Sequence, residues 1–350
     1  MNLEEIFYSC EERLEDFPNG HNYIATYKEF KQFMDEQIHP NVVYMTHRLE
    51  SEVDLNDHSA KHIEMIIRKV SMILWDENGK CNLELELRPY EMFILLMAIQ
   101  IHDAGHIYEG REKHAENAHK LLDRLNQYIV TAPESALINK IANAHSGKND
   151  PIGYLEDETA ISSIPVRVKL LAALLRFSDE LADEYSRASN YRFDENMVSP
   201  KSRLFHAYSQ CLYSFTPRVI SHDVQMQFSL NKSMCTSTYI KPTKEGEKVI
   251  YLLDEIYNRT TKTFLECMYY NRFVPVEVRF TTVNVIISFY DEKTYQEFYP
   301  SIKYRIEEKG YPTISEENIF ALCGNDLIRD GKELNGTFLK EEVEKLEANG

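Results

Sequence analysis

The spacing of apolar residues predicts helices through most of the first half of the chain. Residues 62–75, "HIEMIIRKVSMILW", place isoleucine, valine and leucine every three or four positions, as an amphipathic helix does. Residues 88–103, "RPYEMFILLMAIQIHD", begin with Pro89 near the first turn and are apolar nearly all round, which is typical of a central buried helix. Similar helical patterns cover residues 112–129, 134–147 and 164–187.

The pattern changes after Asn190. Residues 208–215 and 223–230 have the pattern of paired strands, residues 245–270 that of a long helix, and residues 275–289 that of one long or two short strands. We therefore expect a mainly α fold, in which an all-helical bundle is followed by a smaller C-terminal α+β region.

These patterns divide the chain into four parts. We expect N-terminal helices that pack on the core in residues 1–55, the helical domain in 56–195, an accessory α+β region in 196–325 and a loosely held polar tail in 326–350.

The composition is that of a globular protein, because 43% of the 350 residues are hydrophobic. No uncharged apolar run reaches the length of about 18 residues that a membrane-spanning helix needs, and the first residues lack the basic and apolar regions of a signal peptide. The six cysteines contain no C-x-x-C pair, so we interpret them as reduced thiols. We expect a soluble cytoplasmic protein without a membrane partner, and the pattern allows a homo-oligomer.

The net charge bears on the substrate. A formal charge of -17 disfavours the broad phosphate-tracking surface that nucleic-acid binders use, although a local basic cleft is compatible with an acidic protein. A small anionic substrate therefore fits better than a long nucleic acid.

The histidines gather in one part of the sequence, and helical phase tests whether they converge. Eight of the twelve lie between His47 and His145. His102, His114 and His145 continue the apolar stripes of their predicted helices, and His62 lies at the edge of one. We therefore expect these side chains to point toward a common interior.

Asp179 joins this group, because it is in line with Val168, Leu171 and Leu175 on an otherwise apolar helix face. A lone buried carboxylate is costly unless it is paired or bound to a cation. A single inward histidine is more often a hydrogen-bonded core residue than a ligand, but several together with an inward aspartate favour a metal site. Imidazoles and carboxylates hold divalent transition ions, a carboxylate such as Asp103 can bridge two of them, and such ions activate water.

Five further histidines lack such company. His119 shares only Leu122 as an apolar neighbour, which indicates a solvated or supporting group. We expect a structural role for the other four, His21, His39, His206 and His222, so the region after Asn190 should provide no metal ligand.

The order of these residues resembles the HD superfamily of metal-dependent phosphohydrolases, whose pattern is H, HD and a distal D on successive helices. Four segments carry the resemblance: "HSAKHIEMIIRKV", "EMFILLMAIQIHDAGH", "NAHSG" and "LLAALLRFSDELADEYSRA". The last two especially resemble the HD-CE subgroup. The resemblance covers residues 56–189 and implies an HD-type helical bundle.

The resemblance also implies roles for single residues. The primary metal ligands would be His62, His102, Asp103 and Asp179, and the additional ligands of a binuclear centre would be His114 and His145. His106 in "HDAGH" would lie near the scissile phosphate and act in catalysis with Asp103. We expect one or two divalent ions per chain; imidazole ligands favour Mn, Fe, Ni, Co or Zn, and Mg remains compatible.

The activity implied by the resemblance is hydrolysis of phosphoester or phosphoanhydride bonds in a nucleotide or a small cyclic or linear oligonucleotide. Both a phosphodiesterase and a deoxynucleotide triphosphohydrolase fit. Lys148, Arg176 and Arg187 are candidates for further phosphate contacts. Two alternatives stay open: a regulatory module that senses a nucleotide, and a single-strand nuclease.

Overall fold

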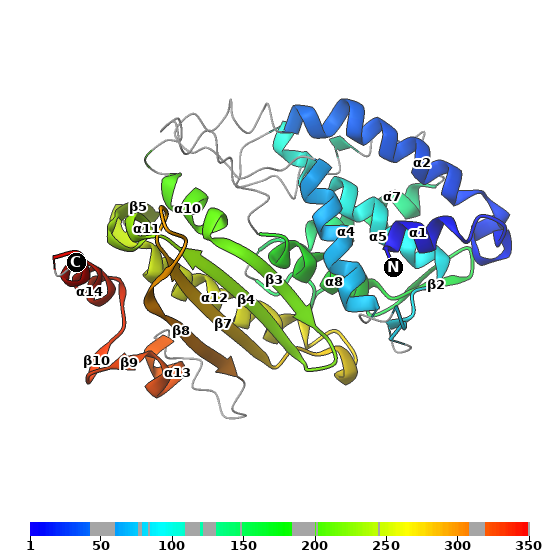
Figure 1. Cartoon of the computed structure of the whole chain (residues 1–350). Coiled ribbons are helices and arrows are strands. Elements are labelled where there is room, and N and C mark those ends of the chain that lie inside the picture. The colour runs from blue at the N-terminus through cyan, green and yellow to red at the C-terminus, as the bar shows by residue number, and fades with distance from the viewer. Residues whose placement is uncertain are drawn as a thin grey trace. The chain divides into compact units, whose positions relative to one another are not determined.

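The structure is a computed structural model of the chain, shown in Figure 1. It describes residues 1–42, 60–75, 79–82, 85–108, 120–121, 131–147, 149–183, 200, 202–243, 246–307 and 319–348. The chain separates into two compact units. Unit 1 comprises Met1–Ser51, Asp57–Ala182 and Tyr269–Arg279, and unit 2 comprises Glu52–Asn56, Asp183–Met268 and Phe280–Gly350.

Unit 1 is helical, with one short hairpin. Its helices are α1 (Leu3–Tyr8), η1 (Leu14–Asp16), η2 (Pro18–Gly20), α2 (Tyr23–Phe33), η3 (Met34–Ile38), α4 (Ala60–Leu74), α5 (Pro89–Ile101), η5 (Ala104–Ile107), α7 (Ala132–Asn143) and α8 (Val168–Leu181). The hairpin is β1 (Thr159–Ile161) with β2 (Ile164–Val166). α5 is the central helix: all of its residues are buried, and it packs against α1, α2, α4, α7 and α8.

A buried ion pair anchors the beginning of α5. The Glu91 carboxylate is fully buried and accepts hydrogen bonds from the backbone N–H of Arg88 at 3.0 Å and of Arg167 at 3.0 Å. The Arg167 guanidinium adds two more, from Nε at 2.9 Å and Nη2 at 2.7 Å. Because Arg167 precedes α8, this pair joins the N-terminal ends of two helices that carry site residues.

Unit 2 is built on a four-stranded sheet with the order β3-β4-β7-β8. The strands are β3 (Leu212–Arg218), β4 (Asp223–Leu230), β7 (Thr282–Tyr290) and β8 (Glu297–Glu307). β4 and β7 are parallel, and the other two pairs are antiparallel. α12 (Leu252–Tyr270) lies along one face (Figure 1), where the Thr260 and Tyr304 hydroxyls are 2.9 Å apart.

Shorter elements complete unit 2. They are α10 (Arg203–Cys211), α11 (Lys232–Thr236), the hairpin of β5 (Thr238–Thr243) and β6 (Gly246–Tyr251), α13 (Ile319–Cys323), η9 (Gly324–Leu327), β9 (Ile328–Arg329), β10 (Lys332–Glu333) and α14 (Gly336–Ala348). η8 (Val276–Val278) belongs to unit 1.

The mainly α fold is confirmed, and so are the helices predicted around residues 62–75, 88–103 and 134–147. The helix predicted over 164–187 begins later, at Val168, because residues 164–166 pair as β2. The helix predicted over 112–129 lies outside the described residues, apart from 120–121.

Three predicted elements of unit 2 differ from the structure. Residues 208–211 continue α10 and only residues from Leu212 onward form a strand, while residues 246–251 pair with β5 as β6 instead of beginning the long helix. The stretch predicted as a loose polar tail contains α14, whose Leu339 and Val343 are buried. These two apolar residues are four positions apart and form one helix face in an otherwise charged sequence.

None of the helices in the described ranges is both long and apolar enough to cross a membrane. The division of the chain into four consecutive parts, with boundaries after residues 55, 195 and 325, stays a prediction.

Glu91→Ala should destabilise the protein by about 3 kcal/mol, because it leaves a largely buried Arg167 without its carboxylate. The measurement is urea unfolding of both proteins. The control is Glu156→Ala, which breaks an exposed pair with Lys140 (N···O 3.0 Å) and should cost less than about 1 kcal/mol. Equal effects of the two substitutions would contradict the anchoring role.

The stability contribution of Glu91 should also depend on pH. Burial alone would raise the pKa of Glu91, but its hydrogen bonds from Arg167 outweigh burial and hold the pKa below the usual 4.5. The contribution is therefore present above that value and is lost as the pH falls through the lower, folded-state pKa. The stability difference between wild type and Glu91→Gln, measured by urea unfolding, should shrink as the pH falls below about 4.5.

Candidate metal centre

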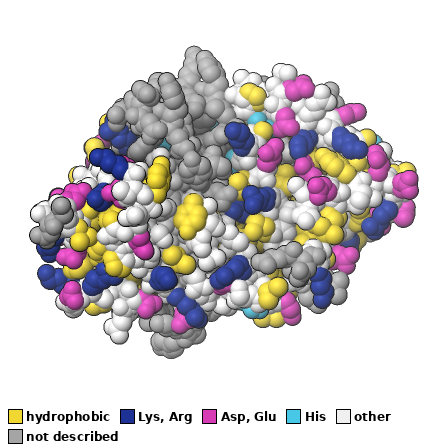
Figure 2. All heavy atoms as spheres, in the orientation of Figure 1, with side chains coloured by type: hydrophobic (Ala, Val, Ile, Leu, Met, Phe, Trp, Pro, Cys, Tyr) yellow, Lys and Arg dark blue, Asp and Glu magenta, His cyan; other side chains and the backbone are white. Residues whose placement is uncertain are grey.

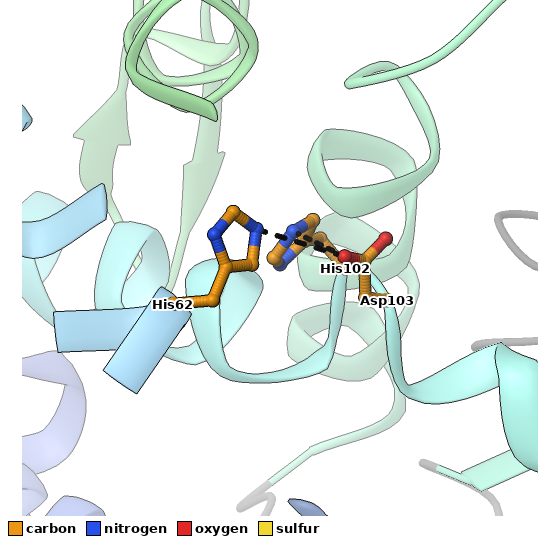
Figure 3. A group of neighbouring side chains, drawn as sticks. All are labelled: His62, His102 and Asp103. Atoms are coloured by element: carbon orange, nitrogen blue, oxygen red, sulfur yellow. Dashed lines mark ion pairs between the residues drawn. The ribbon is translucent and has the colours of Figure 1, made fainter. Parts of the chain in front are cut away.

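Five helices of unit 1 bring the predicted site residues together. The residues and their elements are His62 on α4, His102 and Asp103 directly after α5, His106 in η5, His145 just after α7, and Asp179 on α8. Figure 3 shows the side chains of His62, His102 and Asp103 directed toward one another. One ligand-type atom from each of these three lies within 4.8 Å of the others.

The end of α5 allows two consecutive residues to face one centre. Successive side chains on a continuous helix point in directions about 100° apart. Here α5 ends at Ile101, and Asp103, with φ -99° and ψ -4°, begins the tighter turn of η5. The turn directs Asp103 toward the same interior as His102, because a carboxylate oxygen of Asp103 comes within 3.2 Å of His102 Nε2.

The Asp103 carboxylate lies between two pairs of imidazoles. Its Oδ2 is 3.2 Å from His102 Nε2 and 3.7 Å from His62 Nε2. Its Oδ1 is 3.6 Å from His145 Nε2 and 3.9 Å from His106 Nε2. Each carboxylate oxygen therefore faces a different pair of nitrogen atoms, which is the arrangement of a carboxylate that can bridge two cations.

Asp179 closes the side of the centre next to His62. Its Oδ1 is 3.1 Å from His62 Nε2 and 3.8 Å from His102 Nε2. The Asp179 side chain is 26% exposed, whereas those of the two histidines are 1% and 0% exposed. Asp179 is therefore the most exposed side chain of the centre.

Backbone carbonyls orient two of the rings. Nδ1 of His102 donates to the Ile99 carbonyl at 2.8 Å, and Nδ1 of His145 donates to the Ala142 carbonyl at 2.6 Å. Since a carbonyl can only accept, Nδ1 carries the proton and the neutral ring presents its Nε2 lone pair to the carboxylates. Metal-binding histidines are commonly oriented in this way by a backbone carbonyl.

The His102 Nε2 atom supports a cation at this position. It is buried and makes no hydrogen bond within the described part of the chain, although Asp103 Oδ2 lies 3.2 Å away. A lone pair that faces carboxylate oxygens is unfavourable unless a proton or a metal ion lies between them. The donor set, imidazole nitrogens with carboxylate oxygens, fits a divalent transition ion. This buried His-His-Asp cluster could therefore hold a metal ion.

The charges of the centre compensate one another when no cation is bound. Burial alone would lower the pKa of His102, but the Asp103 and Asp179 carboxylates outweigh burial and raise the pKa well above 6.5. Burial alone would raise the pKa of Asp179, but His102 and His62 hold it well below 3.8. In this state a proton on His102 supplies the positive charge that a metal ion would otherwise supply.

Several predicted site residues are not part of this cluster. His114, Lys148 and Arg187 lie outside the described residues, and so does His119. Arg176 donates from Nη1 to the Gly147 carbonyl at 3.0 Å and stacks over the Tyr269 ring at 4.8 Å. These contacts support the chain after α7, and a phosphate contact of Arg176 stays a prediction.

A polar chain that links the N-terminal helices to α5 was not predicted. His39 Nε2 donates to Gln100 Oε1 at 2.8 Å, and Gln100 Nε2 donates to the Tyr27 hydroxyl at 3.2 Å. The Tyr27 hydroxyl in turn donates to Glu4 Oε1 at 2.6 Å. His39 and Gln100 are both buried. Gln100 could have indicated this chain of hydrogen bonds, because it is a single polar residue in the apolar run that precedes His102.

The chain belongs to the HD-CE family. The model of this family matches residues 52–237, which are 186 of the 350 residues and include all the residues of the cluster. The match ends in unit 2, directly after α11. Comparisons with curated proteins and with solved structures gave no match.

Asp103→Ala and Asp179→Ala should each remove bound metal and leave the helical fold intact, because both carboxylates face the same imidazoles. Metal content after dialysis and far-ultraviolet circular dichroism measure the two effects. The control is Asp157→Ala in the same unit, where the Asp157 side chain is 89% exposed. A metal content in Asp179→Ala equal to that of wild type would show that Asp179 is not a ligand.

Metal affinity should fall as the pH is lowered. The raised pKa keeps His102 protonated at neutral pH in the metal-free centre, so an entering ion has to displace that proton. Below the folded-state pKa of His102, and with one proton displaced, the dissociation constant of the metal should increase about tenfold for each unit by which the pH falls. Competition with a metal indicator at several pH values measures the slope. A slope of zero would mean that the ion does not bind at His102.

Proposed function

We propose that this centre binds one or two divalent transition-metal ions and hydrolyses phosphoester or phosphoanhydride bonds in a nucleotide or small oligonucleotide. The observation that carries the proposal is the Asp103 carboxylate, each of whose oxygens faces its own pair of buried imidazoles. Membership of the HD-CE family supports metal-dependent phosphohydrolase chemistry.

The ligand types favour Mn, Fe, Ni, Co or Zn over Mg, which prefers oxygen ligands and keeps several waters. His62, His102, Asp103 and Asp179 would hold the first ion. His145 on the Oδ1 side of Asp103, with His114 as a predicted partner, would hold a second.

When bound, such ions activate water and neutralise phosphoryl oxygens at neutral pH. The residues of the chain then have separate tasks. Asp103 and Asp179 supply negative charge at fixed positions, and the Ile99 and Ala142 carbonyls keep two histidine rings in one orientation. His106 is 3% exposed, with Nε2 3.9 Å from Asp103 Oδ1, and this position suits a group that gives a proton to the leaving oxygen.

A short substrate is favoured by electrostatics. The chain carries a formal charge of -17, and Figure 2 shows basic side chains dispersed among acidic and uncharged ones over the part of the face in view. Repulsion of a polyanion is screened beyond about 8 Å at physiological salt, whereas bound metal ions attract one or two phosphates at contact. We therefore propose mononucleotides or small oligonucleotides as substrates, with few further contacts from Lys148, Arg176 and Arg187.

A second candidate function is nucleotide sensing, in which the metal centre binds the nucleotide and unit 2 transmits the signal. The observation that favours it is the separate compact unit that follows the helical one.

All six cysteines are among the described residues and are thiols, which suits a reducing compartment, and we propose the cytoplasm.

The wild-type protein with Mn, Ni or Co should hydrolyse members of a panel of linear and cyclic nucleotides, and His106→Ala should lower kcat by about 10²- to 10⁴-fold. The matched control is His21→Gln, which changes an exposed histidine beside Thr26 and Tyr23 in the N-terminal region and should leave kcat unchanged. Wild-type turnover of every panel member no higher than that of Asp103→Ala, with tight binding of one of them, would favour the sensor.

The same assay should include a labelled single strand of some tens of residues as a competitor. Preferential cleavage of the strand, weakening steeply with salt, would overturn the small-substrate proposal and favour a nuclease.

A further inference from the structure

Unit 2 contains a pocket at the carboxyl ends of its two parallel strands. β4 and β7 pair in parallel from Asp223 with Thr282 to Leu230 with Phe289. Directly beyond these ends, Asn231 and Tyr290 line a pocket of about 680 Å³. Ligands commonly bind outside the carboxyl ends of parallel strands, and the volume is that of a small-molecule site. α10, α11 and β5, which Figure 1 shows close together, supply the other walls.

One wall of the pocket contains a buried hydrogen-bond acceptor. Oε1 of Gln210 on α10 is buried and has no hydrogen-bond partner among the described residues. An unsatisfied buried acceptor costs about 1–3 kcal/mol. A ligand with an N–H or O–H group would remove this cost, and side-chain amides of this kind pair with the edges of nucleobases.

Two tyrosines give the pocket aromatic surface. Tyr239 lies on β5 and Tyr290 at the end of β7. Burial, followed by the nearby Cys211 and Cys235, raises the pKa of Tyr239 to about 12, so its hydroxyl stays neutral and can donate at physiological pH. Aromatic rings stack on bases of any sequence.

The charge in the pocket limits the number of phosphates. Among the described residues that line the pocket, Arg203 is the single basic one, and Glu292 also lines it. One guanidinium can hold one phosphate, while the carboxylate disfavours further negative charge. Serine and threonine hydroxyls supply much of the remaining polar surface and suit a ribose.

We propose that this pocket binds a nucleoside monophosphate, as a second ligand site in unit 2. The proposal does not depend on the function of the metal centre, whose cluster lies in unit 1. Ligand binding here would stabilise unit 2 and provide a way to regulate the protein.

The test is calorimetric titration of the full-length Asp103→Asn protein, in EDTA, with AMP, GMP, CMP and adenosine. This background removes metal from the centre of unit 1 and prevents turnover there. We expect one monophosphate per chain. Arg203→Met should weaken monophosphate binding about tenfold or more and leave adenosine binding unchanged, because only the phosphate contact is lost. The control Lys303→Met removes the same charge from an exposed position on β8 and should change neither.

A second variant covers the case in which Arg203→Met does not fold. Ser237→Trp fills the pocket from its wall and should abolish binding of both AMP and adenosine, with circular dichroism unchanged. ATP is titrated in the same way as AMP. No binding of any probe, equal affinity in Arg203→Met, retained binding in Ser237→Trp, or tighter binding of ATP than of AMP would each overturn the proposal.

Discussion

Carboxylates can stay ionised inside the helical unit only if positive charge lies beside them, and the centre of unit 1 is organised around this constraint. α5 is buried along its whole length, so the residues that follow it, His102 and Asp103, are carried into the interior. Asp179 reaches the same place from α8. In the metal-free state a proton on His102 offsets part of the charge of the two carboxylates, and a divalent ion is the alternative. The same constraint therefore relates the fold, the pH dependence of metal binding and the proposed chemistry.

Much of the helical unit could be predicted, because spacing alone reports which face of a helix is buried. The positions of His62 and Asp179 on their helix faces followed from this, and their order along the chain indicated the family. The pairing of each Asp103 oxygen with different histidines could not be predicted, since it depends on the turn after Ile101. The Gln100 to His39 hydrogen bond was missed because it joins residues 61 positions apart.

Unit 2 was harder to predict for a related reason. Local pattern does not separate a strand from a helix when the deciding contacts are with another segment, and residues 246–251 became a strand by pairing with β5. The pocket is a more extreme case. Asn231 and Tyr290 come from distant parts of the sequence, and the parallel pairing of β4 with β7 brings them to one site.

The most direct test of the account is a crystal structure of the full chain loaded with Mn or Co, with anomalous scattering to locate the ions. We expect a peak about 2.0–2.2 Å from His102 Nε2, shared with His62, Asp103 and Asp179, and a second peak on the Oδ1 side of Asp103 next to His145. A single peak next to His102 would support the site of the first ion and contradict the bridging role of Asp103. Anomalous density elsewhere, with none within bonding distance of His102 Nε2, would contradict the account.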